Sequence, residues 1–494
     1  MADNIRTAPL RLRPSEYRSV LWLGDLLMAV VSVFTALYAW EQYNLTVNLP
    51  PLVAKLMEAN KSWSVAKAER EAFAQLDINA PFWFYLLPII WMLLLVELYE
   101  AHVAGSGRKT TRGIALAAFI GLLGYSLVFI LQQNANLPRV GVGAFLLFAS
   151  VLTLLWRMLF IRLYKSTGQR RRALLIGAGK AGQTLAEIYH SLNTQSFNLI
   201  GYIDDDEEKV GKTICDLRVI GSSAHLLDLI DVYHISDIVI AINGEIRGAT
   251  FQTILDAQEK GVEVMRMPIL YEEMTGRVPV HHLETDWIIR SFVDGLHVSG
   301  FYELMKRLLD ILGGIVGILI FAITYPFLAL AVYIDSGLPI FYSQPRLGRG
   351  GLIFSIYKYR TMRQDAEADG EVRITLENDP RVTRVGNFMR KMRLDELPQF
   401  WNVLRGEMSL VGPRAERPEL VAEYQKQIPF YRARLLVKPG LTGWAQINYG
   451  YVASVTETAV KIEYDLYYIK HRTFGMDFQI MLRTIGTVLR RTGR

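Results

Sequence analysis

The sequence predicts a membrane-bound bundle of α-helices followed by two α/β domains. Three observations support this class: four apolar runs of about 20 residues near the N-terminus, a glycine-rich turn between a strand and a helix, and a further apolar run before a basic region of mixed α/β pattern. We divide the 494 residues into a helical bundle (1–165), a nucleotide-fold domain (166–278), a linker (279–300) and a C-terminal domain (301–494).

The composition supports a membrane protein that meets anionic partners. Hydrophobic residues make up 51% of the chain and charged residues 21%, with a net charge of +6. In an apolar chain, this charge suits an anionic lipid surface and phosphate-bearing substrates. The single cysteine, Cys215, excludes an intrachain disulfide and cysteine-based zinc clusters. No motif of a nucleic-acid fold is present, so we predict no nucleic-acid binding.

The helical bundle is predicted from four apolar runs, each long enough to cross a bilayer. They are Val20–Trp40, Phe82–Leu98, Ile114–Leu131 and Val142–Ile161. Short basic segments precede the first run, separate the second from the third, and follow the fourth. Because short basic loops stay on the cytoplasmic side, both ends of the bundle are predicted to face the cytoplasm, and residues 41–80 to form an extracytoplasmic loop.

Asp25 interrupts the first apolar run. A charge in lipid commonly faces protein or water and marks a function. Asp25 lies near the cytoplasmic end of its run, however, and we favour the interpretation that it simply reaches the interface.

A glycine-rich turn marks the second domain. Gly177, Gly179 and Gly182 form a GxGxxG pattern between a predicted strand and helix. Such a turn lets a phosphate approach backbone N–H groups at a helix N-terminus, and an acidic residue about 20 positions on, here Asp204, is the usual ribose partner. Later strands alternate with helices, so we predict a parallel sheet of Rossmann type. Two alternatives stay open for this domain: it binds a nucleotide only for regulation, or it binds no ligand. A fold alone does not determine a function.

A fifth apolar segment, Phe301–Ile334, poses a topological problem. By length it can span a bilayer. The four earlier helices leave the chain in the cytoplasm, so a fifth span would export everything after Asp335. Pro326 removes a helical N–H and clashes with the carbonyl of Ala322, which breaks or kinks the helix. We therefore predict a re-entrant helix over residues 303–335, with an ordinary span as the alternative.

The C-terminal domain carries two adjacent carboxylates, Asp395 and Glu396, among basic residues. Pro398 favours a helix start, which places Asp395 at a helix N-terminus. The positive end of that helix and the nearby bases are expected to favour the ionised form of Asp395, which suits a nucleophile. A second carboxylate beside it can hold a divalent cation. The alternative interpretation is a helix N-cap in a solvated basic face.

The blocks around these carboxylates carry a family resemblance. LDELPQFWNVLRGEMSLVGPR, with KYRTM upstream and KPGLTGWAQINY downstream, resembles the bacterial sugar transferases, which are monotopic polyprenyl-phosphate hexose-1-phosphate (phosphoglycosyl) transferases. The resemblance covers residues 298–494, and the preceding segments make the whole chain similar to the large form of that family. It implies an α/β monotopic catalytic domain whose re-entrant membrane helix breaks at Pro326.

The resemblance also implies roles for individual residues. Asp395 is similar to the family's nucleophile, and Glu396 to the carboxylate that holds magnesium near a diphosphate. Several cations are needed when the bridging oxygen of a diphosphate leaves. The basic residues expected around the substrate phosphates are Lys358, Arg360, Arg390, Arg393 and Arg414. Membrane-surface adhesion by the same bases is the alternative. Tyr464 and Asp465 on a later helix are further site candidates.

The implied reaction moves a hexose-1-phosphate from a UDP-hexose to undecaprenyl phosphate, releases UMP, and passes through a phosphosugar on Asp395. Glucose is the expected sugar and galactose the alternative. The product would start exopolysaccharide, capsule or O-antigen synthesis at the cytoplasmic face of the bacterial inner membrane. Mg²⁺, membrane lipids and downstream glycosyltransferases are the expected partners, and a homodimer stays open.

Other functions compete with this one. A sugar-nucleotide-binding scaffold or regulator would use the GxGxxG domain and keep the basic domain only for membrane contact. A polytopic transferase without a covalent step would carry many more spans. A dehydratase or epimerase would carry a Tyr-x-x-x-Lys pair after the nucleotide fold, and residues 189–268 contain none.

Overall fold

The computed structural model describes residues 14–76, 80–99, 107–131, 139–166, 171–192, 197–283, 300–363, 366, 379–450 and 454–489. The chain forms two compact units, Met1–Arg170 and Arg171–Arg494. Residues 284–299 of the predicted linker 279–300 lie outside the described part of the chain.

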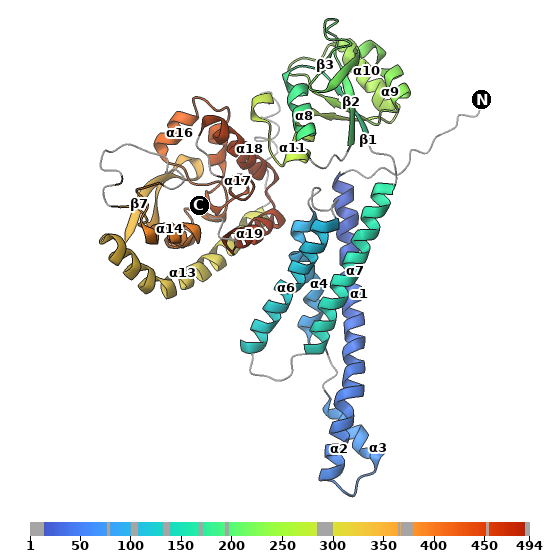
Figure 1. The fold of residues 1–494 in the computed structure, drawn as a ribbon, viewed down its shortest axis with the longest axis vertical. Coiled ribbons are helices and arrows are strands. Elements are labelled where there is room, and N and C mark those ends of the chain that lie inside the picture. Colours follow the sequence, from blue (N-terminus) through green and yellow to red (C-terminus); the bar gives the residue numbers. More distant parts are fainter. Residues whose placement is uncertain are drawn as a thin grey trace, which may run out of the picture. The chain divides into compact units, whose positions relative to one another are not determined.

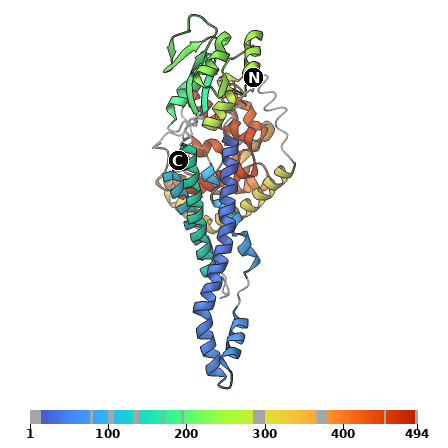
Figure 2. The same ribbon diagram turned by 90° about the vertical axis from the view of Figure 1, so that its right-hand side faces the viewer.

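The first unit is helical. Its helices are α1 (Pro14–Tyr43), η1 (Asn44–Asn48), α2 (Leu49–Ala59), α3 (Val65–Gln75), η2 (Phe82–Leu86), α4 (Leu87–Leu94), η3 (Val96–Tyr99), α6 (Gly107–Leu131) and α7 (Arg139–Ser166). Helix α7 packs against α1 and α6, and α4 packs against α1. Figure 1 and Figure 2 both show α2 and α3 at one end of α1, while α1 starts and α7 ends at the other. This arrangement agrees with the predicted sides of the loops.

The described residues form helices of membrane-spanning length at the first, third and fourth predicted spans and at the fifth apolar segment, but not at the second predicted span. Among the described residues, four helices are long and apolar enough to cross a membrane: Ser19–Ala59, Gly107–Ile130, Arg139–Leu163 and Gly300–Ser336. The second predicted span is shorter, because its apolar residues divide into η2, α4 and η3, with Pro88 in the first turn of α4. Composition and length together are those of a membrane protein.

Asp25 does not reach the interface, so the favoured interpretation was wrong. Its side chain is fully buried, and both carboxylate oxygens accept hydrogen bonds from Arg157 of α7, the shortest at 2.6 Å to Nη2. Arg157 Nη1 also donates to the carbonyl of Leu98 at 2.9 Å. A buried charge persists when it is paired and hydrogen-bonded, so this ion pair ties α1 to α7 inside the bundle.

The second unit opens with the predicted α/β sheet. Its strands have the order β3-β4-β2-β1-β5-β6, and all neighbours are parallel except β3 and β4. The elements are β1 (Arg171–Ile176), α8 (Lys180–Ser191), β2 (Phe197–Ile203), β3 (Thr213–Ile214), β4 (Leu217–Gly221), η4 (Ser223–His225), α9 (Leu226–Tyr233), β5 (Asp237–Ile240), α10 (Gly248–Glu259), β6 (Glu263–Arg266) and α11 (Met267–Thr275). The strand order reverses at β1, the usual ligand crevice of doubly wound sheets.

Helix α11 connects this sheet to the C-terminal part of the same unit. Its Tyr271 packs into the core beneath the sheet, yet donates from its hydroxyl to Glu463 Oε2 of α18 (Val455–His471) at 2.9 Å. Val278 N–H donates to the carbonyl of Glu463 at 3.1 Å. The two α/β parts are therefore joined by buried hydrogen bonds.

The C-terminal part packs on one side of a long helix, α13 (Gly300–Ser336). A hairpin of β7 (Phe341–Leu347) and β8 (Ile353–Tyr359) is closed by η7 (Arg349–Gly351). The remaining elements are α14 (Arg384–Lys391), η8 (Leu394–Gln399), α15 (Phe400–Arg405), β9 (Ser409–Val411), α16 (Pro418–Tyr424), η9 (Tyr431–Leu436), β10 (Gly440–Thr442), α17 (Trp444–Asn448), α18 and α19 (Phe474–Leu489). Strands β9 and β10 are parallel.

Helix α13 lies along the C-terminal domain and continues through Pro326 without a break. Figure 1 shows it curved, as expected where a proline removes a helical hydrogen bond. Gly314 and Gly317 allow the backbone of α13 to pack closely against α15. A Cβ added to Gly314 would lie 2.6 Å from Leu404 Cδ2, and one added to Gly317 would lie 2.2 Å from Phe400 Cδ1. The opposite side of α13 exposes large apolar residues along its whole length.

Candidate functional site

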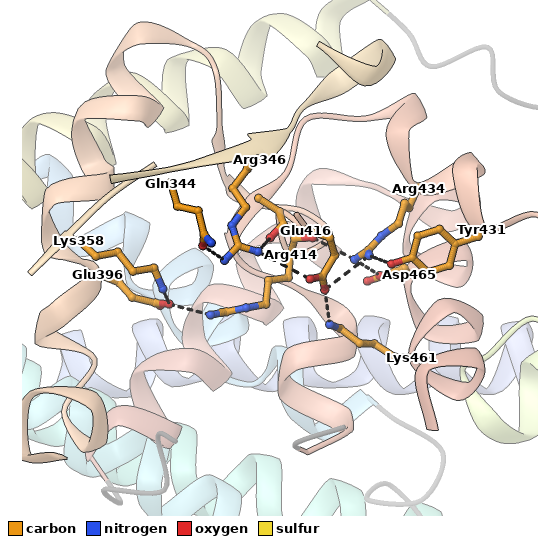
Figure 3. Close-up of polar contacts among 11 residues, drawn as sticks. Gln344, Arg346, Lys358, Glu396, Arg414, Glu416, Tyr431, Arg434, Lys461 and Asp465 are labelled. Atoms are coloured by element: carbon orange, nitrogen blue, oxygen red, sulfur yellow. Dashed lines mark hydrogen bonds and ion pairs between the residues drawn. The ribbon is translucent and has the colours of Figure 1, made fainter. Parts of the chain in front are cut away.

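The carboxylate pair lies on η8, directly before α15. Lys358 comes from β8 and Arg414 from the segment after β9, and both reach Glu396. Lys358 Nζ is 2.8 Å and Arg414 Nη2 3.1 Å from the same oxygen, Glu396 Oε1 (Figure 3). Burial disfavours the charge of Glu396, but these two cations hold its pKa far below the usual range. Three predicted residues, far apart in sequence, therefore meet in one ion cluster.

Asp395 differs from its neighbour. It is 8% exposed, and its carboxylate makes no hydrogen bond or ion pair with any residue that the structure describes. Burial raises its pKa, the negative charge of Glu396 adds to the rise, and Lys358, Arg390 and Arg414 oppose it. The expectation that helix and bases would favour ionisation is thus wrong in direction, because burial outweighs them. Asp395 is a buried carboxyl group without a bound partner.

The other predicted cations divide into two groups. Arg390, in the last turn of α14, lowers the pKa of Asp395 and donates from Nε to Thr361 Oγ1 at 2.9 Å. Arg393 Nη1 lies 4.0 Å from Glu396 Oε2. Arg360 is buried elsewhere: its Nη2 donates to the carbonyls of Ser336 and Gly337 at 2.6 and 2.5 Å, so it holds the C-terminal end of α13.

A second ion cluster fixes the backbone that carries Arg414. The carbonyls of residues 414, 415 and 416 accept hydrogen bonds from Arg434 Nη2, Arg346 Nη1 and Leu347 N–H, at 3.0, 3.2 and 3.1 Å. Arg434 is in turn bound by Asp465 Oδ2 at 2.9 Å (Figure 3). These hydrogen bonds hold the backbone of residues 414–416 in place, and the guanidinium of Arg414 points at Glu396.

Glu416 is the acidic centre of that second cluster. Its Oε1 lies 2.7 Å from Lys461 Nζ and 3.6 Å from Arg434 Nη1. Although burial opposes its charge, Lys461 and Arg434 lower the pKa of Glu416 to about 2. Sequence reasoning identified Asp465 but missed Glu416, Arg434 and Lys461. The only local signal for them is the position of Glu416 two residues after Arg414.

A cleft opens beside the first cluster. It is a shallow hollow with a free volume of about 10 Å³, and its lining includes Lys358, Glu396, Arg414, Arg346 and Gln399. Arg346 shares a face of the β7–β8 hairpin with Lys358, because alternate residues of paired strands point to the same side. The cleft therefore offers three cations and a carboxylate to an anionic ligand.

The expected magnesium site has a limited set of donors. Within the described part of the chain, no three His, Cys, Asp or Glu side chains gather as a metal site. Mg²⁺, however, commonly uses one or two carboxylates, several waters and substrate phosphates. Glu396 Oε1 is bound by cations, which leaves Oε2 and the carboxylate of Asp395. These donors fit Mg²⁺ when a phosphate-bearing ligand supplies the rest.

The glycine turn has the geometry predicted for it. Gly177 has a φ of 105°, and an added Cβ on Gly182 would lie 2.1 Å from the Gly177 carbonyl oxygen, so both positions require glycine. Nothing lies within 4 Å of a Cβ on Gly179, which leaves room for a ligand. Asp204 is nevertheless occupied, because its Oδ2 accepts from the N–H of Ala178 at 2.8 Å. The nucleotide role of this turn stays a prediction.

The fold and site define a membrane protein whose second α/β part presents a carboxylate pair among cations. Residues 301–491 match the family described as bacterial sugar transferase, and residues 96–267 match one described as CoA-binding domain. The exopolysaccharide production protein PSS of Rhizobium leguminosarum bv. phaseoli is 36% identical over 192 residues, 38% of this chain and 96% of that protein. The chain belongs to the bacterial sugar transferase family.

Two further relatives, both longer than the Rhizobium protein, match this chain over part of their length. UDP-N-acetylgalactosamine-undecaprenyl-phosphate N-acetylgalactosaminephosphotransferase of Aeromonas hydrophila is 40% identical over 228 residues, 46% of this chain and 52% of that protein. Undecaprenyl-phosphate glucose phosphotransferase of Komagataeibacter xylinus is 30% identical over 327 residues, 64% of this chain and 58% of that protein. This chain thus spans little more than half the length of these two relatives.

Proposed function

We propose that this protein transfers glucose-1-phosphate from UDP-glucose to undecaprenyl phosphate at the cytoplasmic face of a bacterial inner membrane, with galactose as the alternative hexose. One observation carries the proposal: within the described part of the chain, the buried carboxyl group of Asp395 has no hydrogen-bond or ion-pair partner, whereas its neighbour Glu396 is held by Lys358 and Arg414. An unbonded carboxylate among cations is suited to attack an anionic phosphorus centre. The names of the relatives add a UDP-sugar and an undecaprenyl phosphate as the substrate classes.

The first step is attack by a carboxylate oxygen of Asp395 on the phosphorus that bears the sugar. An O–P bond forms, the bond to the bridging oxygen breaks, and UMP leaves with that oxygen. Lys358, Arg414 and Arg346, which line the cleft, neutralise charge on the diphosphate as it separates. The attack needs ionised Asp395, and Lys358, Arg390 and Arg414 act against the effect of burial.

The second step restores the carboxylate. A phosphate oxygen of undecaprenyl phosphate attacks the phosphorus of the phosphosugar, and Asp395 leaves as the carboxylate. The product is undecaprenyl diphosphate sugar, the first lipid-linked intermediate of a surface polysaccharide. Mg²⁺ would be held by Glu396 and, when bound, would supply positive charge to the phosphate of UMP as it leaves in the first step. The second ion cluster keeps Arg414 in place during both steps.

Nucleotide release tests the proposal. Purified full-length protein in lipid nanodiscs receives Mg²⁺, undecaprenyl phosphate and one donor: UDP-glucose, UDP-galactose or UDP-N-acetylgalactosamine. We expect UMP with the wild type and none with Asp395→Asn, while Lys426→Ala, an exposed site, keeps the wild-type rate. Release of UDP would contradict the proposal, because it indicates plain glycosyl transfer.

A labelling experiment tests the covalent step separately. The donor carries a radioactive phosphorus next to the sugar, and the acceptor is left out. We expect label that stays on denatured wild-type protein, maps to the peptide containing Asp395, and is absent from Asp395→Asn. Release of UMP that depends on acceptor, without any labelled protein, would refute the phosphosugar on Asp395.

A further inference from the structure

A pair of cations lies on the C-terminal domain beside the end of α15. Arg307 comes from the amphipathic start of α13, and Lys438 from the segment between η9 and β10. A Cβ added to Gly406 would lie 3.4 Å from Arg307 Nη2 and 3.5 Å from Lys438 Nζ. The two positive groups therefore converge on one point, and neither lines the carboxylate cleft.

Only one of these two cations is hydrogen-bonded to the described part of the chain. Arg307 donates to the carbonyls of Val403 and Leu404 at 2.8 and 2.7 Å, which caps the C-terminus of α15. The ammonium of Lys438 makes no hydrogen bond or ion pair with any residue in the described ranges. Burial, Arg307 and Arg349 lower the pKa of Lys438, whereas the charges of Asp310 and Glu303 act in the opposite direction, and the net change is a decrease.

The nearest carboxylates are already engaged. Asp310 Oδ1 accepts from Ser409 Oγ at 2.9 Å and from the N–H of Leu410 at 2.8 Å. Glu303 pairs with Arg349 at 3.7 Å, an exposed contact that ties the β7–β8 turn to α13. Neither carboxylate hydrogen-bonds Lys438, although the charges of both favour its protonated form, so the ammonium can still donate to an external anion.

Exposed apolar side chains lie on the segments that carry this pair, beside the exposed ion pair of Glu303 and Arg349. Phe301, Leu304 and Leu308 of α13 are 71%, 57% and 45% exposed, and Leu352 in the β7–β8 turn is 75% exposed. Leu436, two residues before Lys438, is 44% exposed. Basic side chains next to exposed apolar ones are typical of a surface at the boundary between lipid and water. Three of these apolar residues belong to α13, one of the helices apolar enough to enter a membrane.

We propose that Lys438 and Arg307 form a binding site for the phosphate of an anionic phospholipid headgroup. The phosphate would accept from Lys438 Nζ, and the acyl chains would lie along Leu304 and Leu308 of α13. Charge complementarity selects an anion, and the exposed apolar side chains of α13 favour one that is carried by a lipid rather than free phosphate. The site is separate from the reaction of Asp395 and does not depend on it.

Native mass spectrometry of the detergent-solubilised full-length protein tests this site directly. The protein is titrated with phosphatidylglycerol, and with phosphatidylcholine as the zwitterionic probe. We expect Lys438→Ala to weaken phosphatidylglycerol binding about fivefold, the effect of one basic residue at a membrane surface. Lys438→Arg should keep the affinity, and Lys426→Ala, which removes an exposed lysine elsewhere, should leave it unchanged.

Several results would overturn the proposal. Unchanged phosphatidylglycerol affinity in Lys438→Ala is one, and an equal loss in Lys426→Ala is another. A raised KM for undecaprenyl phosphate in Lys438→Ala, with phosphatidylglycerol binding intact, would assign the site to the acceptor instead. Asp395→Asn should bind phosphatidylglycerol as the wild type does, so a failure of the proposed transferase reaction and a failure of the lipid site are distinguishable.

Discussion

Replacing Lys358 by methionine is expected to move the acid limb of the transferase activity to higher pH. Burial raises the pKa of Asp395 above the ordinary 3.8, and Lys358 is the strongest of the cations that lower it. A nucleophilic Asp395 works only when ionised, so activity is present above its pKa and is lost as the pH falls through it. One opposite charge at close range lowers a carboxyl pKa by about 1–3 units, so removing Lys358 should shift the limb upward by at least about 1 unit.

The assay is kcat/KM for the UDP-sugar, measured by UMP release across the pH range in which the protein stays folded. Lys358→Met also removes the 2.8 Å hydrogen bond to Glu396, so the maximal rate is expected to fall as well. The position of the limb, rather than its height, is therefore the test. Lys358→Arg should keep the wild-type position because it keeps the charge. An identical acid limb in wild type and Lys358→Met would refute the reasoning, as would a wild-type limb below the ordinary aspartate pKa.

Three further outcomes are expected. Asp465→Asn removes one of two carboxylates that pair with buried Arg434, at 2.9 Å; because Glu416 stays 3.6 Å away, the loss should be smaller than the penalty of about 3–5 kcal/mol for an unpaired buried charge, and the solubilised protein should still melt at a lower temperature; unchanged melting would contradict this. Gly182→Ala should make the nucleotide-fold domain sensitive to protease, because the Cβ would lie 2.1 Å from the Gly177 carbonyl oxygen, whereas Gly248→Ala, with free space, should not. Chelation should stop UMP release and added Mg²⁺ should restore it; activity that survives chelation would exclude the metal role.

Local patterns predicted the parts of the fold that depend on neighbouring residues. The GxGxxG spacing led to the turn in which Gly177 and Gly182 meet, because glycine is required by φ and by close packing at those positions. The alternation of strands and helices after that turn predicted the parallel sheet. These features follow from the periodicity of a strand or turn, which the sequence carries directly.

Features that depend on burial or on distant partners could not be predicted in the same way. The prediction that Asp395 favours its ionised form was wrong in direction, because the burial of a side chain cannot be read from the spacing of charges along the sequence. Arg157 lies 132 residues after Asp25, and Arg434 lies 20 residues after Arg414, so neither pair leaves a periodic signal. Such contacts are set by tertiary packing alone.

The glycines of α13 connect this helix closely to the carboxylates. Gly314 and Gly317 let Leu404 and Phe400 pack directly on the helix backbone, in the segment that immediately follows Asp395 and Glu396. Because close packing resists deformation, we expect the helix and the carboxylates to shift together. With α13 in lipid, as the sequence predicts, the depth of the helix would set how far the carboxylates stand from the membrane. Membranes of different thickness should change the reaction rate through this height, without touching any residue of the cleft.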